Sequence, residues 1–210
     1  MIRLFLVDDH AMLREGLRRQ FEDSRDIRIC GEAGSAKELS ARLKGSQADV
    51  IILDLNLPDA NGITLITEVK KILPSCKVIV LTMYDHVRYA ISALESGAEG
   101  FVVKGSPFEE LMEAVRSVHK GKSFVSADMA RRLIGRIRKG ATTGGVEQLS
   151  EREFEVLTML SRGMTLKEVA ETMNISSKTV TTYRARLMDK LGLTTTSEII
   201  RYAMENDLLK

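Results

Sequence analysis

The chain has 210 residues, of which 44% are hydrophobic and 29% are charged, and its net charge is +2. This length suits one large or two ordinary domains, and so large an apolar share excludes a chain that is disordered throughout. The near balance of charge excludes strong steering of the whole molecule toward DNA or anionic lipid. No membrane span or export signal is apparent, and we expect Cys30 and Cys76 to be buried, reduced thiols in a cytoplasmic protein.

The first 125 residues alternate short apolar runs with amphipathic stretches. This pattern is typical of a parallel sheet that helices cover on both faces. The run Ile27–Gly31 alternates apolar and polar residues, which predicts an edge strand. The other predicted strands are nearly uninterrupted apolar runs: Ile2–Val7, Val50–Leu53, Val78–Leu81 and Phe101–Val103.

Helix start signals lie between these strands. Ser35 with Glu38 predicts an N-cap with an acidic partner three residues on, and so does Ser106, which a proline follows, with Glu109. We therefore predict an α/β domain over residues 1–122, a doubly wound (βα)5 sheet of the flavodoxin-like order 2-1-3-4-5.

The composition shifts after this domain. Ala127–Arg138 places apolar side chains at helical spacing and arginines on the remaining faces, so it predicts a helix. Gly140–Gly145 is rich in glycine and poor in apolar side chains, which is typical of a flexible linker. We assign residues 123–147 to this linker and residues 148–210 to a smaller second domain.

The second domain shows no strand pattern and four helix starts, which predict an all-helical fold. One start lies at Ser176 or Ser177, and the other three are capping boxes: Ser150 with Glu153, Thr165 with Glu168, and Thr195 with Glu198.

Charge is unevenly distributed along the chain. Residues 1–125, 126–145 and 146–210 carry net charges of −1, +4 and −1. Within the last segment, the single predicted helix over Lys178–Lys190 carries a local charge of +3. A basic stripe on a nearly neutral domain is what contact with a phosphate backbone requires, although basic side chains on a helix are also commonly just solvated.

Polar side chains follow four of the predicted strands. Asp8 and Asp9 follow the first strand, Asp54 the third, Thr82 the fourth and Lys104 the fifth. Ligands of doubly wound sheets bind outside the carboxyl ends of the strands, where the winding reverses, so these side chains are expected to converge. Each alone has an ordinary interpretation, as a helix cap, a turn residue, a strand end or a surface charge, and their joint occurrence favours a site.

Three neighbouring carboxylates repel one another unless a cation holds them, and oxygen ligands suit Mg²⁺. Asp9, Asp54 and the backbone carbonyl of Asn56 form a suitable ligand set. An aspartate can also be the nucleophile toward phosphorus, while Lys104 would offset the charge of a transferred phosphoryl group and Thr82 would supply a hydroxyl.

Over roughly its first 120 residues, the chain resembles the receiver domain of two-component response regulators. The matching motifs are VDDH at Val7–His10, DLNLPDANG at Asp54–Gly62, LT at Leu81–Thr82 and GAEGFVVK at Gly97–Lys104. The resemblance implies Asp54 as phosphoryl acceptor, Asp8 and Asp9 as the metal-binding pair, and Thr82 and Lys104 as the switch hydroxyl and lysine. It implies Phe101 as the aromatic switch, for which a plain core residue is the alternative.

Two positions depart from that family. Many receivers have a proline after the lysine, whereas Gly105 stands here, so a cis Lys-Pro bond is excluded. The residue after the switch threonine is often small, and here it is Met83, from which we predict slower loss of the phosphoryl group.

Thr165–Leu191 predicts a helix, a short turn and a second helix. Asn174 can adopt the left-handed conformation that ends the first helix. At 100° per residue, the face opposite the apolar line of the second helix is polar and partly cationic, and it suits a major groove: Lys178, Thr182, Ala185 and Asp189, flanked by Thr181 and Arg186.

Residues 149–193 resemble the LuxR-type helix-turn-helix of NarL/FixJ response regulators, through LSEREFEVLTMLSRG, KEVAETMNISSKTV and KLGL. The resemblance implies that Thr181, Thr182 and Ala185 read base edges. It also implies phosphate contacts from a further set: Lys178, Thr179, Tyr183, Arg184, Arg186 and Lys190. The last helix of this family pairs two domains, which makes Ile199, Ile200 and Ala203 candidates for dimerisation, the alternative being that both apolar faces of this helix are buried within the domain.

We therefore expect a cytoplasmic transcription regulator whose partners are a sensor histidine kinase, promoter DNA and a second copy of the chain. It would not be an enzyme beyond accepting and slowly losing a phosphoryl group. One alternative is a DNA-binding regulator that works without phosphorylation. Another is an aspartyl-phosphate phosphatase, which is disfavoured because such enzymes have a second carboxylate two residues after the nucleophile, where this chain has Asn56.

Overall fold

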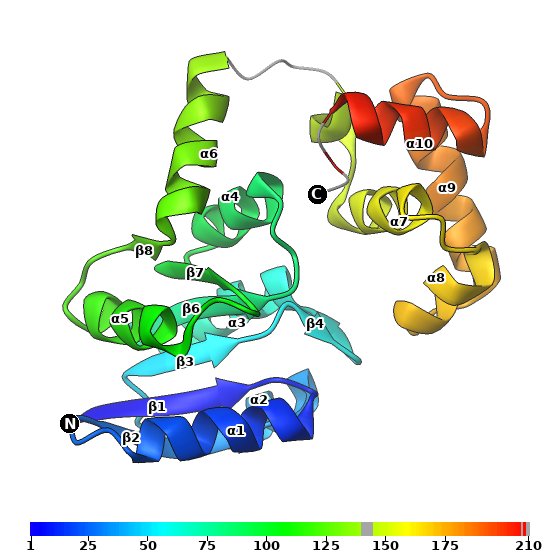
Figure 1. The fold of residues 1–210 in the computed structure, drawn as a ribbon. Helices are drawn as coiled ribbons and strands as arrows, with labels where there is room; N and C mark the ends of the chain where they lie inside the picture. The colour runs from blue at the N-terminus through cyan, green and yellow to red at the C-terminus, as the bar shows by residue number, and fades with distance from the viewer. Residues whose placement is uncertain (140–144, 207, 209–210) are drawn as a thin grey trace. The chain divides into compact units, whose positions relative to one another are not determined.

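The computed structural model describes residues 1–139, 145–206 and 208, which divide into two compact units, Met1–Gly135 and Arg136–Lys210 (Figure 1). The first unit contains a six-stranded parallel sheet of order β2-β1-β3-β6-β7-β8. Its strands are β1 (Ile2–Val7), β2 (Ile27–Ala33), β3 (Val50–Leu53), β6 (Lys77–Thr82), β7 (Gly100–Val103) and β8 (Phe124–Val125). The predicted order is confirmed for the first five of these strands, with β2 at one edge.

Helices cover both faces of this sheet. One face shares a core with α1 and α5, in which Leu17, Phe21 and Leu111 pack against Leu6 and Ile52. Figure 1 shows α2 and α3 behind the sheet. The helices are α1 (Ala11–Glu22), α2 (Ala36–Leu43), α3 (Gly62–Ile72), α4 (Val87–Glu95) and α5 (Phe108–His119).

Three details of this unit differ from the sequence predictions. Pro107 and not Ser106 is the N-cap of α5, and it makes no side-chain cap bond, so that prediction is wrong: the proline holds an extended conformation and the helix begins at Phe108. Cys30 is exposed on the edge strand, whereas Cys76 is buried as expected. The two-residue strand β8 was not expected.

The outer strand β2 has a free edge because it pairs only with β1. Arg42 of α2 donates from its guanidinium Nη1 to the carbonyl oxygen of Glu32 in this strand. A side chain from the neighbouring helix therefore satisfies one main-chain acceptor of the edge.

The connecting helix α6 (Ala127–Lys139) begins within the first unit. Met129 on this helix is 1% exposed, and the Arg132 guanidinium Nη1 donates to the carbonyl oxygen of Asp85 at 2.9 Å. Both contacts attach the start of α6 to the first unit. The domain boundaries at residues 122 and 148 stay predictions, and residues 140–144 of the predicted flexible linker lie outside the described residues.

The second unit contains a 3-10 turn η1 (Gly145–Gln148) and four helices, and the residues described in it form no strand. All three predicted capping boxes are present, and the fourth start is Ser176, whose side chain accepts from the Thr179 N–H. Asn174 has a φ of 52° and ends the helix before it, as expected. The helices are α7 (Glu151–Ser161), α8 (Leu166–Thr172), α9 (Ser177–Leu191) and α10 (Thr196–Glu205).

Candidate functional site

The structure brings the predicted polar side chains together at the carboxyl ends of the strands. Asp54 follows β3 and is fixed beside β1, because its N–H donates to the carbonyl of Val7 at 2.8 Å. Lys104 follows β7, and its N–H donates to the carbonyl of Thr82, the last residue of β6, at 2.7 Å. The hydrogen bonds between neighbouring parallel strands thus set the distances between the side chains of the site.

Lys104 joins two of the carboxylates. Its Nζ lies 2.6 Å from Oδ2 of Asp54 and 2.7 Å from Oδ2 of Asp8. All three groups are largely removed from water, since the side chains of Lys104, Asp54 and Asp8 are 9%, 1% and 5% exposed. A buried cation is therefore paired with two buried anions, which is the arrangement that makes burial of such charges tolerable.

Burial and pairing act on these groups in opposite directions. Burial raises the pKa of the Asp54 carboxyl, and the nearby ammonium of Lys104 only partly offsets this effect. Burial opposes the charge of Lys104 as well, but the Asp54 and Asp8 carboxylates leave its pKa above the ordinary value. Lys104 is thus firmly protonated, and Asp54 is more basic than a solvated aspartate.

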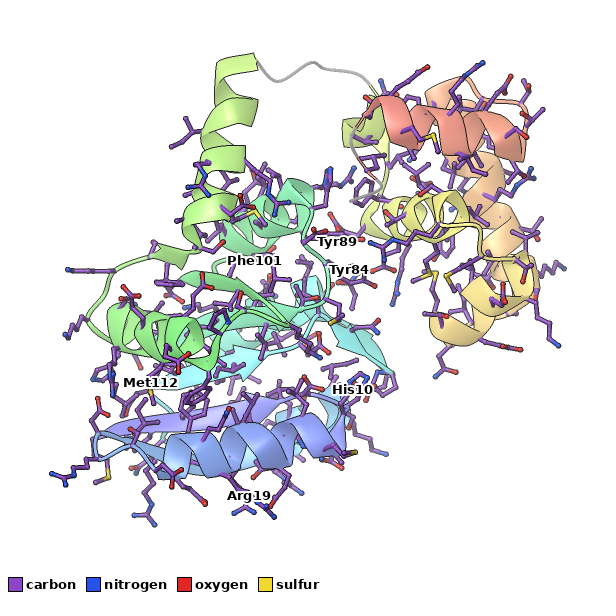
Figure 2. The ribbon with its side chains drawn as sticks, in the orientation of Figure 1. His10, Arg19, Tyr84, Tyr89, Phe101 and Met112 are labelled. Atoms are coloured by element: carbon purple, nitrogen blue, oxygen red, sulfur yellow. The ribbon has the colours of Figure 1, made fainter. Side chains whose placement is uncertain are left out.

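Three carboxylates and a histidine could share one cation here. One ligand atom from each of Asp8, Asp9, His10 and Asp54 lies within 4.8 Å of the others. The Nδ1 atom of His10, labelled in Figure 2, lies 2.7 Å from Oδ1 of Asp9 and 3.1 Å from Oδ1 of Asp8. Oxygen-rich surroundings fit a hard divalent cation. His10 belongs to the VDDH motif, but the sequence does not reveal its contacts with Asp8 and Asp9.

The loop after β3 shapes the site through a short hairpin, β4 (Asn56–Leu57) with β5 (Ala60–Asn61). The Asn56 N–H donates to Oδ1 of Asp54 at 3.1 Å, while its predicted role as a carbonyl ligand stays a prediction. Gly62 closes the hairpin, and a Cβ there would lie 2.3 Å from Cα of Leu55. Only glycine permits this approach, which explains the end of the DLNLPDANG motif.

The predicted switch residues lie on neighbouring strands: Thr82 ends β6, and Phe101 is the second residue of β7. Thr82 and Phe101 are both buried, at 0% and 1% exposure, with Phe101 labelled inside the unit in Figure 2. The hydroxyl Oγ1 of Thr82 accepts from the Tyr84 N–H at 3.3 Å. Met83, between these two, is 70% exposed, and Gly105 has the positive φ of 102° that glycine adopts without strain.

In the second unit, α9 presents the expected polar face. Val180 and Leu187 are buried beneath it, at 0% exposure each. All three predicted base-reading residues, Thr181, Thr182 and Ala185, are exposed on this face. The other exposed residues of the face are Lys178, Arg186, Asp189 and Lys190. Thr179, Tyr183 and Arg184 are only half-buried, so their side chains also reach the surface.

Two cationic side chains of α9 already have partners within the unit. The Nζ of Lys190 lies 2.6 Å from Oε2 of Glu153, a carboxylate that is 4% exposed and completes the capping box of α7. The guanidinium of Arg184 donates to the hydroxyl of Thr196 at 3.1 Å. These bonds give Lys190 and Arg184 structural roles that their helical positions did not reveal.

Two of the three dimerisation candidates on α10 are wrong. Ile199 and Ala203 are each 0% exposed, because positions four residues apart share the helix face that packs on α7. Ile200 is half-buried, and Met204, which is not one of the predicted residues, is 64% exposed. The accessible apolar surface of α10 therefore includes Ile200 and Met204, with Tyr202 also half-buried.

No helix in the described part of the chain is long and apolar enough to cross a membrane. The family model of the response regulator receiver domain matches residues 4–116, and that of the bacterial regulatory proteins of the luxR family matches residues 147–203. The two models thus coincide with the parallel sheet and with the helical unit.

Similar proteins cover the whole length of the chain. Response regulator UvrY of Escherichia coli (strain K12) is 30% identical over 99% of this chain and 96% of its own. Oxygen regulatory protein NreC of Staphylococcus aureus (strain JH9) is 30% identical over 100% of both chains. RcsB from Salmonella enterica serovar Typhimurium, solved bound to promoter P1flhDC with the phosphomimetic BeF3⁻, is 30% identical with a TM-score of 0.66 over 97% of this chain and 98% of its own. The chain belongs to the two-component response regulators of the NarL/FixJ type, which join a receiver domain to a LuxR-type DNA-binding domain.

Proposed function

We propose that Asp54 accepts a phosphoryl group from a sensor histidine kinase and that the phosphorylated chain binds promoter DNA as a homodimer. One observation carries this proposal: a buried Asp54 carboxylate pairs with Lys104, which also pairs with Asp8, where the winding of the sheet reverses. The site contains a nucleophile, a fixed cation and further oxygen ligands.

In the transfer, a carboxylate oxygen of Asp54 attacks the phosphorus of a phosphohistidine. The new P–O bond forms as the P–N bond breaks, and the leaving imidazole takes up a proton. Lys104, already 2.6 Å from Oδ2 of Asp54, stays in place to offset negative charge on the phosphoryl oxygens. Asp8, Asp9, Asp54 and the Asn56 carbonyl would hold Mg²⁺, which when bound supplies further positive charge at those oxygens.

The response would begin at Thr82. A phosphoryl group on Asp54 offers the Thr82 hydroxyl a strong acceptor, whereas that hydroxyl now accepts from the Tyr84 N–H at 3.3 Å. A hydroxyl that turns toward the phosphoryl group changes the loop that follows β6 and the space around Phe101. Phosphorylation then acts by stabilising one of two receiver conformations over the other.

The helical unit would bind double-stranded DNA through α9. Thr181, Thr182 and Ala185 are exposed and short enough to face base edges, while Lys178 and Arg186 are exposed cations that suit phosphate contacts. RcsB has been solved as dimers on DNA. For this chain, Ile200 and Met204 on α10 supply the apolar surface for pairing two copies, and the regulator would act in the cytoplasm, where the DNA is.

The Asp54→Asn variant tests this function. Incubated with a phosphorylated sensor kinase and Mg²⁺, the wild-type chain should gain one acid-stable, base-labile phosphoryl group and the variant none. Phosphorylation should also tighten wild-type binding to promoter DNA and leave the variant unchanged. Equal DNA binding by both proteins, with and without the kinase, would instead favour the regulator that works without phosphorylation.

A further inference from the structure

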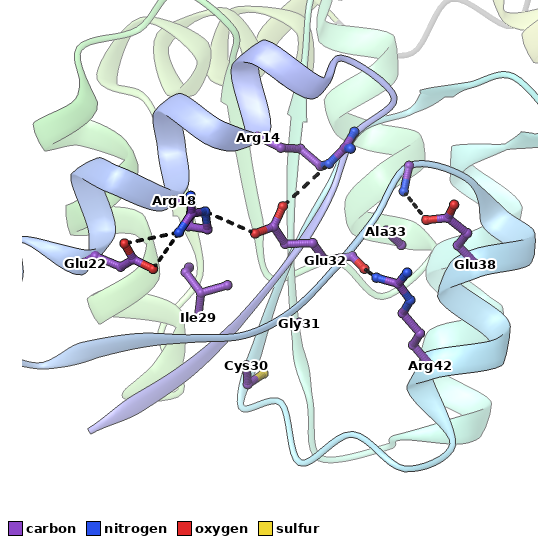
Figure 3. A pocket seen from close by; sticks show the side chains of 11 residues that line it. Arg14, Arg18, Glu22, Ile29, Cys30, Gly31, Glu32, Ala33, Glu38 and Arg42 are labelled. Atoms are coloured by element: carbon purple, nitrogen blue, oxygen red, sulfur yellow. Dashed lines mark hydrogen bonds and ion pairs between the residues drawn. The ribbon is translucent and has the colours of Figure 1, made fainter.

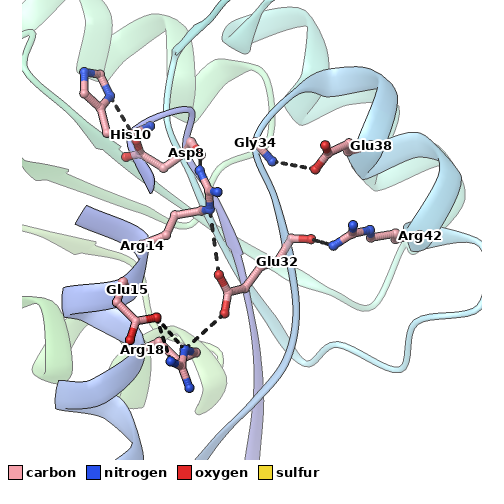
Figure 4. A network of polar contacts seen from close by, with 9 residues as sticks. All are labelled: Asp8, His10, Arg14, Glu15, Arg18, Glu32, Gly34, Glu38 and Arg42. Carbon is pink, nitrogen blue, oxygen red and sulfur yellow. Dashed lines mark hydrogen bonds and ion pairs between the residues drawn. The ribbon is translucent and has the colours of Figure 1, made fainter. Parts of the chain in front are cut away.

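Arg14 of α1 contacts the main chain of the acidic site. Its guanidinium Nη1 donates to the carbonyl oxygen of Asp8 (Figure 4). The N–H of Asp8 in turn donates to the carbonyl of Ala33 at 3.1 Å, which continues the pairing of β1 with β2. Both backbone groups of Asp8 are therefore held, one by the sheet and one by Arg14.

The side chain of Asp8 depends on this fixed backbone. Its Oδ1 accepts from the His10 N–H at 2.8 Å, and its Oδ2 lies 2.7 Å from Nζ of Lys104. A rotation of the Asp8–Asp9 peptide would move the carboxylates of both residues, because the chain turns here from β1 into α1. The bond from Arg14 opposes that rotation.

A glutamate on the neighbouring strand is a charge partner of Arg14. Oε2 of Glu32 lies 3.7 Å from Nε of Arg14, and Oε1 of the same carboxylate lies 3.6 Å from Nε of Arg18. These side chains line a cavity of about 630 Å³ beside β2 (Figure 3). Arg14 is the more enclosed arginine, with 20% of its side chain exposed against 34% for Arg18.

We propose that Arg14 is a positioning residue for the cation site, acting through the Asp8 carbonyl and supported by Glu32. This inference rests on the proposed function of the acidic site. A group behind the ligands that fixes their orientation commonly changes metal affinity by about 10- to 100-fold when it is removed. Arg18 shares the helix and the Glu32 carboxylate, but its bonds run to Glu15, Glu22 and Glu32 and not to Asp8.

Mn²⁺ binding to the full chain tests the proposal, with free Mn²⁺ counted by electron paramagnetic resonance. Arg14→Gln should raise the dissociation constant by roughly 10-fold. Arg14→Lys, which can still donate to the Asp8 carbonyl, should recover part of the affinity. Arg18→Gln is the matched control and should bind like the wild type, with thermal midpoints recorded for every variant.

The rate of Asp54 phosphorylation by a small phosphoryl donor supplies a second readout. Arg14→Gln should need more Mg²⁺ for half-maximal rate and reach the wild-type rate at saturation, a separation that loss of folded protein would not produce. Wild-type binding of Mn²⁺ together with an unchanged constant for Arg14→Gln would overturn the role of Arg14 alone. A wild-type chain that binds no Mn²⁺ would overturn the proposed function and this inference together.

Discussion

Met83 shields the phosphoryl site in our interpretation. It is 70% exposed and directly follows the switch residue Thr82. We expect Met83→Ala to lose the phosphoryl group from Asp54 a few-fold faster, because water reaches the acyl phosphate more easily. The decay of radiolabelled protein measures this, with Ile134→Ala, an exposed apolar residue on α6, as control. An unchanged decay rate for Met83→Ala would remove the shielding role.

Single residues of the acidic site divide into those whose role follows from their position at the end of a strand and those whose role does not. Asp54 and Lys104 could be predicted, because each directly follows an apolar run and parallel strands end at one edge of the sheet. Arg14 and His10 could not, because their roles depend on bonds to Asp8 that only the turn into α1 creates. Side-chain contacts of this kind leave no periodic signal in the sequence.

Lys190 stabilises the helical unit by pairing with the buried carboxylate of Glu153. Burial opposes the charge on Glu153, but the hydrogen bonds from Lys190 and from the Ser150 N–H hold its pKa below the ordinary value. A lowered folded-state pKa means stability that is present above the unfolded pKa of about 4.3 and is lost as the pH falls through the folded pKa. The pair therefore stabilises the fold at neutral pH and fails in acid.

Replacement of Lys190 tests whether its pair with Glu153 makes the stability of the unit depend on pH. We expect Lys190→Met to cost about 1–2 kcal/mol of unfolding free energy at pH 7, because Glu153 stays buried without its cation. The difference from wild type should shrink below pH 4, where Glu153 takes up a proton. Urea unfolding at several pH values measures it, with Lys178→Met on the same helix as control. A loss that is independent of pH would contradict the assignment.

At the level of elements, the sequence predicted the strands and helix starts that depend on neighbouring residues alone. Four apolar runs and one alternating run predicted β1, β2, β3, β6 and β7, and serine or threonine with glutamate three residues on marked the starts of α7, α8 and α10. The strand β8 and the hairpin of β4 and β5 are only two residues per strand, too short for a periodic pattern. The inward face of α10 also escaped prediction, since its apolar residues occupy more than one side.

The hairpin after Asp54 depends on Gly62. Its missing Cβ would lie 2.3 Å from the main chain at Leu55, where no flexible side chain can yield. We expect Gly62→Ala to cost about 1–3 kcal/mol, as overpacking does, and to slow phosphorylation by shifting the loop after β3. Gly16 within α1 has open space around it, so Gly16→Ala should stabilise the fold by about 0.5–1 kcal/mol. Thermal unfolding of both variants gives the comparison, and equal effects would contradict the steric argument.

At the scale of the whole molecule, the net charge of +2 conceals an uneven distribution. Residues 1–125 and 146–210 each carry a net charge of −1, residues 126–145 carry +4, and α9 holds a local charge of +3 within its nearly neutral domain. Few cations per copy implies weak binding by one domain, so a tight complex requires two copies on one DNA.

A charge on the exposed side of α10 tests this requirement. Met204 is 64% exposed and lies outside the core of its unit, so Met204→Asp should fold normally. We expect the variant to lose cooperative binding to an inverted pair of sites while it binds a single half-site as wild type does. Raised salt should weaken the paired complex more steeply than the single one, because more phosphate contacts are lost. Unimpaired cooperativity in Met204→Asp would place the dimer contact elsewhere.

The bond between Arg42 and the Glu32 carbonyl bears on how the protein behaves at high concentration. An outer strand with open main-chain acceptors is a template onto which a strand of another chain can add. A guanidinium over one of those acceptors interrupts the row, and its charge discourages a second copy from approaching. The seven-residue strand β2 can thus lie at the edge of the sheet without pairing with strands of other copies and starting aggregation.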